Sequence, residues 1–224
     1  MRAALAFLTP IGGARPPSPR SLPWFPIVGA VVGGTVGVAW WLAGEVWDPL
    51  VAAALAVAAD LALTGMLHHD GLADSADGLL PHLPVERRLA VMRQPDIGAF
   101  GVSAVGVVLL VQVAALASMA PDPVLLVALF ASSRGGAAVI LASRPYARPG
   151  GLAEAFRGRA PLAWVLTFVA IAALGSVEPL ALAAVPAFAG VIVLAERRLG
   201  GYTGDTLGAA IVVAQTVGVL GAAT

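Results

Sequence analysis

Long apolar stretches alternate with short polar connections along the whole chain. A window of about 19 residues, the length that crosses a bilayer as a helix, identifies candidate spans near residues 24–43, 49–67, 99–119, 123–142, 161–176, 179–195 and 206–222. Two of these, 161–176 and 179–195, are short for a hydrocarbon core of ~30 Å, so either is expected to be tilted, broken or re-entrant. The pattern predicts an all-α, polytopic integral membrane helix bundle of about seven spans, with five as a lower limit, in one membrane-embedded domain over residues 1–224.

The composition fits a chain surrounded by lipid. Hydrophobic residues make up 59% and charged residues 12%, with a mean hydropathy of +0.90. The net charge of zero argues against nucleic-acid binding, which needs a basic surface. The absence of cysteine excludes disulfides, thiolate nucleophiles and cysteine metal sites. All thirteen basic residues are arginine, which genomic base composition alone would explain; the planar guanidinium group also suits phosphate binding.

The arginines outside the apolar stretches predict the orientation. They fall in alternate connections: Arg2, Arg15 and Arg20; Arg87, Arg88 and Arg93; Arg144, Arg148, Arg157 and Arg159; Arg197 and Arg198. The remaining connections, 44–48, 120–122 and 177–178, contain acidic residues and no arginine. By the positive-inside rule the arginine-bearing side is cytoplasmic, with the N-terminus inside and the C-terminus outside.

Three aspartates in the connection after the second stretch form the most informative motif. Asp70, Asp74 and Asp77 stand at i, i+4 and i+7, a spacing that places them on one stripe of a helix. Residues 67–84 contain no arginine or lysine to neutralise them, which favours a hard divalent cation such as Mg²⁺ with a phosphorylated substrate. The alternative is a solvated helix end, although basic residues normally interleave with acids on an exposed face. The pattern therefore predicts phosphate chemistry on the cytoplasmic face.

The helix carrying this stripe is predicted to continue the second span as far as Leu80, where Pro81 stops it. A short amphipathic stretch at 85–93 follows, and a turn then leads into the third span. Asp96 in that turn has two open interpretations: it joins the metal cluster, or it caps the next helix.

The adjacent histidines His68 and His69 raise the alternative of a zinc site. Neighbouring imidazoles point about 100° apart on a helix, whereas zinc usually takes histidines at i and i+4 or a distant third ligand. The other interpretations are that one histidine acts as a hydrogen-bond donor or general base, or lies passively at the lipid interface.

Two charged residues, Asp60 and Arg134, lie inside apolar stretches at similar distances from the cytoplasmic ends. Isolated charges are costly there, so such residues are functional candidates. Two hypotheses stay open. The residues form a structural ion pair, or Arg134 faces a cytoplasmic cavity and clamps phosphate.

Glycines suggest close packing in one region and ligand binding in another. Gly29, Gly33 and Gly37 form a ladder typical of tight helix contact, either within the chain or in a homo-oligomer. The segments 144–151 and 200–206 combine glycine with arginine or hydroxyl groups on the side that carries the aspartates. Together they predict a shared phosphate-binding site.

The chain resembles the cobalamin synthase family, the integral-membrane adenosylcobinamide-GDP ribazoletransferases of late vitamin B12 synthesis, over essentially its whole length. The most specific segment is Leu67–Gly78, which contains the three aspartates. Further matching segments are Phe7–Pro10, Phe25–Gly29, Met92-Arg93, Ile97–Gly101, Arg144–Arg148 and Gly200–Ala209. The chain departs from the family at Gln215, where members often carry a glutamate, so the role of that carboxylate is in doubt here.

The resemblance implies a reaction in the prokaryotic inner membrane. A ribose hydroxyl of α-ribazole, or of its 5′-phosphate, attacks adenosylcobinamide-GDP, giving adenosylcobalamin or its phosphate and GMP. Asp70, Asp74 and Asp77 would hold Mg²⁺, with Asp96 or Asp205 completing the shell. An aspartate of the cluster or His69 would act as base. The expected substrate-binding residues are Arg93, Arg134, Arg144, Arg148, Thr203 and Asp205.

Two other functions compete with this interpretation. A CDP-alcohol phosphotransferase also places aspartates on membrane helices around metal ions, but its signature has an Ala-Arg pair after Asp-Gly and longer spacing to the later acids, which this chain lacks. A membrane transporter would concentrate polar groups near the bilayer midplane, whereas here they gather at the cytoplasmic rim.

Overall fold

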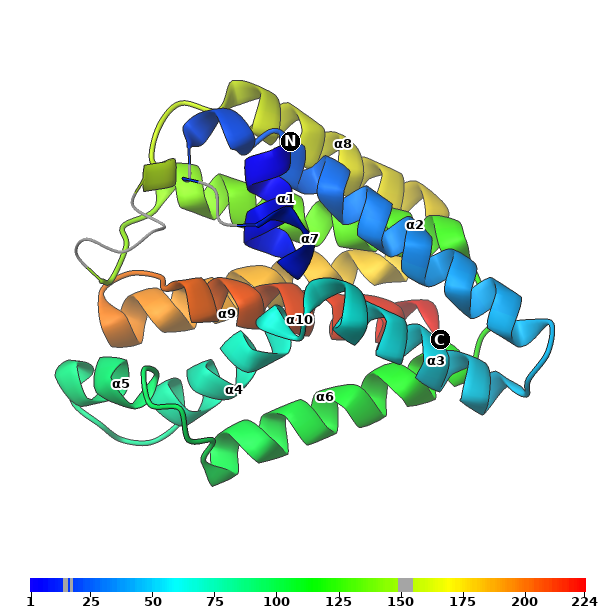
Figure 1. The fold of residues 1–224 in the computed structure, drawn as a ribbon, viewed down its shortest axis with the longest axis horizontal. Coiled ribbons are helices and arrows are strands. Elements are labelled where there is room, and N and C mark those ends of the chain that lie inside the picture. Colours follow the sequence, from blue (N-terminus) through cyan, green and yellow to red (C-terminus); the bar gives the residue numbers. More distant parts are fainter. Residues whose placement is uncertain (14–15, 17, 149–154) are drawn as a thin grey trace.

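A computed structural model describes residues 1–13, 16, 18–148 and 155–224. Over these ranges the chain is helical apart from turns, loops and one isolated parallel bridge between Tyr146 and Tyr202, which confirms the all-α prediction (Figure 1). The helices are α1 Arg2–Leu8, α2 Trp24–Gly44, α3 Pro49–Thr64, α4 Leu67–Leu79, α5 Val85–Val91, α6 Ala99–Ala117, α7 Pro123–Ser143, α8 Pro161–Val177, α9 Ala184–Leu199 and α10 Gly204–Ala222. Short 3-10 helices are η1 Pro10–Gly12, η2 Pro19–Ser21 and η4 Pro179–Ala183.

The protein is a multi-pass membrane helix bundle. In the described ranges, five helices are long and apolar enough to cross a membrane: α2, α6, α7, α10 and the continuous segment Pro179–Leu199. The bent pair of α3 and α4 would make a sixth, and α8 is apolar but only 17 residues long. Each predicted apolar stretch is thus a helix, while the count of about seven spans is not confirmed.

The prediction that one continuous helix runs from the second span to Leu80 is wrong. The chain breaks between α3 and α4, whose axes differ by 89°. Gly65 and Met66 both adopt left-handed backbone conformations with φ of 59°, and the N–H of Met66 donates to the carbonyl of Leu61 at 2.9 Å, which ends α3. A Cβ on Gly65 would lie 3.0 Å from Pro10, so the N-terminal segment packs directly over the break. The aspartate stripe therefore belongs to a separate helix that turns away from the span.

The glycine ladder of α2 packs against α7 of the same chain. A Cβ on Gly37 would lie 2.6 Å from Cα of Pro123, and Cβ atoms on Gly29 and Gly33 would collide with backbone carbonyls of α7. The backbones of the two helices approach closely only because these positions lack side chains. The ladder thus serves packing within the chain.

Helices α7 and α10 form the centre of the bundle. In their apolar windows 72% and 67% of the residues are buried, against 28% in α6. Gln112 of α6 donates a hydrogen bond of 2.9 Å to Thr216 of α10, which ties the outer helix to the central one. At its start α10 meets α4, where a Cβ on Gly71 would lie 2.7 Å from the carbonyl oxygen of Asp205. The aspartates of both helices are thereby brought to one end of the bundle.

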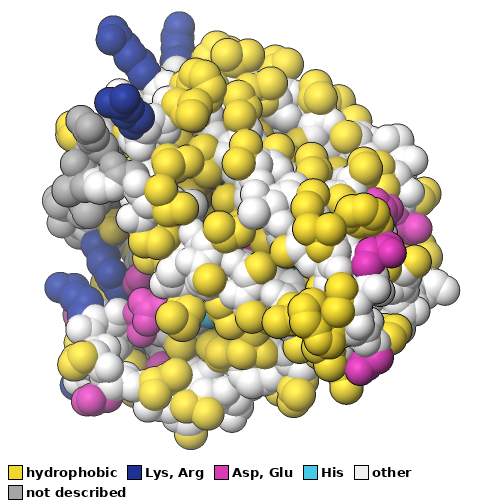
Figure 2. Space-filling view, turned by 45° about the vertical axis from the view of Figure 1, so that its right-hand side comes forward, with side chains coloured by type: hydrophobic (Ala, Val, Ile, Leu, Met, Phe, Trp, Pro, Cys, Tyr) yellow, Lys and Arg dark blue, Asp and Glu magenta, His cyan; other side chains and the backbone are white. Residues whose placement is uncertain are grey.

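The two ends of the bundle differ in charge. On the face drawn in Figure 2, arginine side chains gather at one end, with acidic side chains beside them, and the charged side chains visible at the opposite end are acidic. Asp48 and Asp122, in the connections without arginine, accept hydrogen bonds from the first backbone N–H groups of α3 and α7. These acids thus have a structural role as helix caps.

Candidate active site

The aspartate stripe lies on α4 as the spacing predicted. Asp70 is exposed, Asp74 and Asp77 are half-buried, and the opposite side of α4 packs into the bundle through Leu72 and Ala76. Side chains at i, i+4 and i+7 follow one line on a helix, so the three carboxylates share one face. The helical interpretation of the motif is confirmed.

Two arginines hold the C-terminal end of α4. Arg88 is buried and donates from Nη1 to the carbonyls of Gly78 at 2.8 Å and Leu79 at 2.7 Å. Arg198 of α9 donates to the carbonyl of Leu79 as well. Carbonyls at a helix C-terminus lack partners within the helix and carry partial negative charge, which the guanidinium groups satisfy. The sequence predicts both arginines on the same side of the membrane as α4, but it does not predict that they contact the C-terminal carbonyls of this helix.

Asp205 in the first turn of α10 forms the second part of the site. Its Oδ2 accepts a hydrogen bond of 2.9 Å from Nη2 of Arg148, in an ion pair whose side chains are 24% and 20% exposed. The hydroxyl of Thr203 lies 3.3 Å from the same oxygen and also accepts from the N–H of Thr206 at 3.2 Å, capping α10. The cap thus fixes Asp205 beside α4.

The two glycine-containing loops lie side by side, as the shared-site hypothesis requires. The N–H of Ala147 donates to the carbonyl of Tyr202 at 2.8 Å, and the N–H of Tyr202 donates to the carbonyl of Pro145 at 3.1 Å. A Cβ on Gly201 would lie 2.5 Å from the carbonyl oxygen of Pro145, so only glycine permits this approach. Residues 149–151 of the predicted phosphate loop lie outside the described ranges.

The carboxylates of α4 and α10 interact electrostatically. Burial, and then the negative charges of Asp205 and Asp70, raise the pKa of Asp74 to about 7, although Arg148 acts to lower it. Asp74 lies on α4, which is separate from the five continuous spans. Among the described residues, no group of three or more histidine or acidic side chains is close enough to hold a metal ion as it stands. The site is therefore an accumulation of negative charge with one cationic neighbour.

Asp77 has a structural contact that the sequence did not predict. Its carboxylate accepts hydrogen bonds from the N–H of Gly98 at 2.7 Å and of Gly101 at 2.9 Å, and so caps α6. Asp96 is exposed and provides no cap, because the N-cap residue of α6 is Gly98. The capping interpretation of Asp96 is wrong because a residue from α4 takes that place; its role as a metal ligand stays a prediction.

The histidines lie on the buried side of α4. His68 and His69 are each 5% exposed, and neither ring nitrogen of His69 has a hydrogen-bond partner among the described residues. Burial, and then the positive charge of Arg134, lower the pKa of His69, which favours the neutral form of its imidazole. A neutral imidazole can accept a proton, but this ring projects about 100° around the helix from Asp70. His69 remains a predicted base that does not share the face of the carboxylates.

The other predicted phosphate ligands have partners elsewhere. Nε of Arg93 donates to the carbonyl of Leu89 at 3.2 Å. Nε of Arg144 lies 3.7 Å from Oε1 of Glu196 on α9. Arg148 is the predicted arginine that the structure brings into direct contact with an aspartate of the site.

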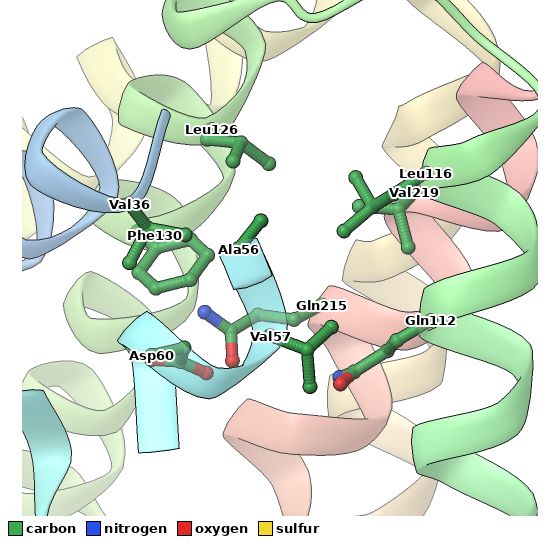
Figure 3. A pocket seen from close by; sticks show the side chains of 10 residues that line it. All are labelled: Val36, Ala56, Val57, Asp60, Gln112, Leu116, Leu126, Phe130, Gln215 and Val219. Carbon is green, nitrogen blue, oxygen red and sulfur yellow. The ribbon is translucent and has the colours of Figure 1, made fainter. Parts of the chain in front are cut away.

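Asp60 and Arg134 form the ion pair that was one of the two hypotheses. Nη2 of Arg134 lies 3.9 Å from Oδ1 of Asp60, and the arginine side chain is 1% exposed and stacks over Phe130 at 4.4 Å. Figure 3 shows Asp60, Gln112 and Gln215 around one pocket inside the bundle. Gln215 stands ten residues after Asp205, roughly 15 Å along α10. It therefore belongs to this interior group and not to the aspartate face.

Comparison with known proteins identifies the family of this chain. The family model described as cobalamin-5-phosphate synthase matches residues 1–223. A curated adenosylcobinamide-GDP ribazoletransferase from Ralstonia nicotianae is 40% identical, covering 85% of this chain and 79% of its own. One from Ectopseudomonas mendocina is 38% identical, covering 98% and 96%. No solved structure matches the chain. The chain belongs to the cobalamin-5-phosphate synthase family.

Proposed function

We propose that this chain is an adenosylcobinamide-GDP ribazoletransferase that joins adenosylcobinamide-GDP to α-ribazole or α-ribazole 5′-phosphate. The ribose 3′ oxygen forms a bond to the cobinamide-side phosphorus, the bond from that phosphorus to the bridging diphosphate oxygen breaks, and GMP leaves. The hydroxyl proton passes to a base. The observation that carries the proposal is the meeting of the α4 carboxylates with the Arg148–Asp205 pair in a chain of this family.

A divalent cation suits the donor set of this site. Asp70, Asp74 and Asp205 supply oxygen atoms only, which Mg²⁺ prefers. Burial first, and then the negative charges of Asp205 and Asp70, raise the pKa of Asp74, and a bound cation would offset both effects. We assign these carboxylates, with Asp77 and Asp96 as further candidates, to Mg²⁺ binding. The ion would supply charge neutralisation on the diphosphate.

The chain's own residues provide positioning around that charge. Arg148 is held toward Asp205 and is placed to bind a phosphate oxygen in a forked geometry. The cap made by Thr203 and the contact of Gly201 with Pro145 keep the two loops in register. A carboxylate on the exposed face of α4 is the better candidate than His69 to accept the proton, because His69 projects into the bundle.

We propose that the protein spans the inner membrane of a prokaryotic cell and that its arginine-bearing end faces the cytoplasm. Twelve arginines in alternate connections support this orientation, since positive residues are retained on the inner side. The N-terminus is then inside and the C-terminus outside, and the site opens toward nucleotide substrates.

The test uses the purified full-length protein with adenosylcobinamide-GDP, α-ribazole and Mg²⁺. The expected result is release of GMP and formation of adenosylcobalamin, both dependent on each substrate and abolished by EDTA. Release of GMP without α-ribazole would indicate hydrolysis and contradict the proposed acceptor. Full activity in EDTA would contradict the role of a divalent cation.

A further inference from the structure

A lateral groove runs between α7, α8 and α9, and none of the aspartates of the site lines it. It encloses about 830 Å³ of empty space, including its opening to the outside. The wall-forming side chains are mostly apolar: Ile140, Trp164, Phe168, Phe188, Ala189 and Ile192. Phe168 is 75% exposed and Trp164 is 50% exposed, so the outer wall faces the surroundings of the bundle. Since these helices form the apolar part of a membrane protein, the medium that enters this groove is lipid.

The groove has one polar end, at the arginine-bearing side of the membrane. Arg144 caps the C-terminus of α7, and its side chain is 55% exposed. Glu196 on α9 lies opposite, with Oε1 3.7 Å from Nε of Arg144. This oxygen is buried and accepts no hydrogen bond from any residue that the structure describes. One cationic and one anionic group therefore stand side by side where the groove meets water.

We propose that this groove binds a phospholipid whose headgroup carries a phosphate and a primary ammonium group, the phosphatidylethanolamine class. The phosphate lies on Arg144 and the ammonium group donates hydrogen bonds to Glu196. An acyl chain then follows α7 from Arg144 to Gly136, eight residues or roughly 12 Å along the helix, and ends against Phe188. Trp164 in the first turn of α8 lies at the level where tryptophan is enriched, the membrane–water interface.

Charge complementarity selects this headgroup over the other common ones. The phosphate of an anionic phosphatidylglycerol also pairs with Arg144, but the headgroup carries no cation to pair with Glu196. A phosphatidylcholine carries a cation that has no N–H group, so Oε1 of Glu196 receives no hydrogen bond. Only a primary ammonium zwitterion provides both the charge and the donor that the two side chains require.

The test is native mass spectrometry of the purified full chain in mild detergent, with phosphatidylethanolamine, phosphatidylcholine and phosphatidylglycerol of identical acyl chains at physiological ionic strength. Phosphatidylethanolamine is expected to bind about tenfold more tightly than phosphatidylcholine, as one charge-assisted hydrogen bond implies. Glu196→Gln is expected to remove that preference. Equal binding of the two lipids by the unmodified protein, or tightest binding of phosphatidylglycerol, would overturn the proposal.

A matched pair of variants tests the place of the acyl chain. Ala189→Phe fills the groove from α9, whereas Gly190→Phe adds a ring at the next position, where no atom lies within 4 Å of the added Cβ and which does not line the groove. Ala189→Phe is expected to lose phosphatidylethanolamine binding and Gly190→Phe to keep it, with both melting like the unmodified protein. Undiminished binding in a folded Ala189→Phe protein would also overturn the proposal.

Discussion

Carboxylates at the two ends of the bundle do different things, although both ends use the same residue types. At the end without arginine, Asp48, Asp122 and Glu178 each accept backbone N–H groups at the start of a helix. At the arginine-bearing end, Asp74 lies in the middle of α4, where the helix offers no free N–H group, and its neighbours include Asp70 and Asp205. An acid that caps a helix stabilises the fold, whereas an acid held among other acids favours a cationic ligand. This contrast supports the proposal that the active site lies at the arginine-bearing end.

The largest difference in activity is expected between two variants that each remove one carboxylate charge, one at each end of the bundle. Asp74→Asn should lower the rate of GMP release by ~10³-fold, because it removes a proposed ligand of the divalent cation that would neutralise the diphosphate. Asp122→Asn keeps a side chain that caps α7 and should change the rate by less than about twofold. The measurement is the steady-state transfer assay on membrane-inserted protein. Substantial activity in Asp74→Asn would refute the assignment of that residue to the metal.

The second comparison sets a buried arginine against an exposed one. Arg134→Ala leaves Asp60 without its partner inside the bundle and should cost ~3–5 kcal/mol of stability. Arg144→Ala removes an ion pair at the surface and should cost no more than ~1 kcal/mol. Thermal unfolding in detergent measures both.

A charge-swapped double variant distinguishes packing from phosphate binding at this buried pair. Asp60→Arg combined with Arg134→Asp should recover most of the stability lost in Arg134→Ala, and also the activity, if the pair is structural. Recovered stability without activity would show instead that Arg134 contacts the substrate.

Local sequence patterns predicted the helices and the aspartate stripe. The features that the sequence did not predict depend on contacts between residues that are far apart in the chain. Apolar windows and the i, i+4, i+7 spacing depend only on helix geometry. The break after α3 depends on Gly65 and Met66 in left-handed conformations beneath Pro10, and no local rule forces a methionine there. Likewise the cap of α6 comes from Asp77, 21 residues before Gly98, and not from the nearby Asp96. The guanidinium of Arg198 reaches α4 from α9 in the same way.

The cap formed by Asp77 provides a smaller test, because it is a structural contact at the active end. Asp77→Ala and Asp122→Ala should each cost ~1–2 kcal/mol, the usual effect of losing an N-cap. Only Asp77→Ala should also lower the transfer rate, since Asp77 joins α4, with its aspartate stripe, to the start of α6. Melting curves and the transfer assay on both variants measure this, and equal activities would show that the position of α4 does not depend on the cap.

The smallest expected effect concerns the charge of the site without substrate. The pKa of Asp74 is raised to about 7 in the folded protein, so the folded state binds more protons than the unfolded state between pH 4 and 7. Without a divalent cation, the melting temperature should therefore fall as the pH rises through this window. Mg²⁺ at ten times its dissociation constant adds ~1.4 kcal/mol, or ~3–6 °C in a chain of this size.

Protons compete with the cation for Asp74, so the shift caused by Mg²⁺ should be larger at pH 8 than at pH 6. Asp74→Asn should abolish this difference between the two pH values, whereas Asp48→Asn, at the opposite end, should leave it intact. A Mg²⁺ shift that is equal at both pH values, or that survives in Asp74→Asn, would mean that the cation binds elsewhere. The proposed difference between the two ends, helix capping at one and cation binding at the other, would then be wrong. The aspartates of α4 would instead be solvated surface residues that bind no ligand.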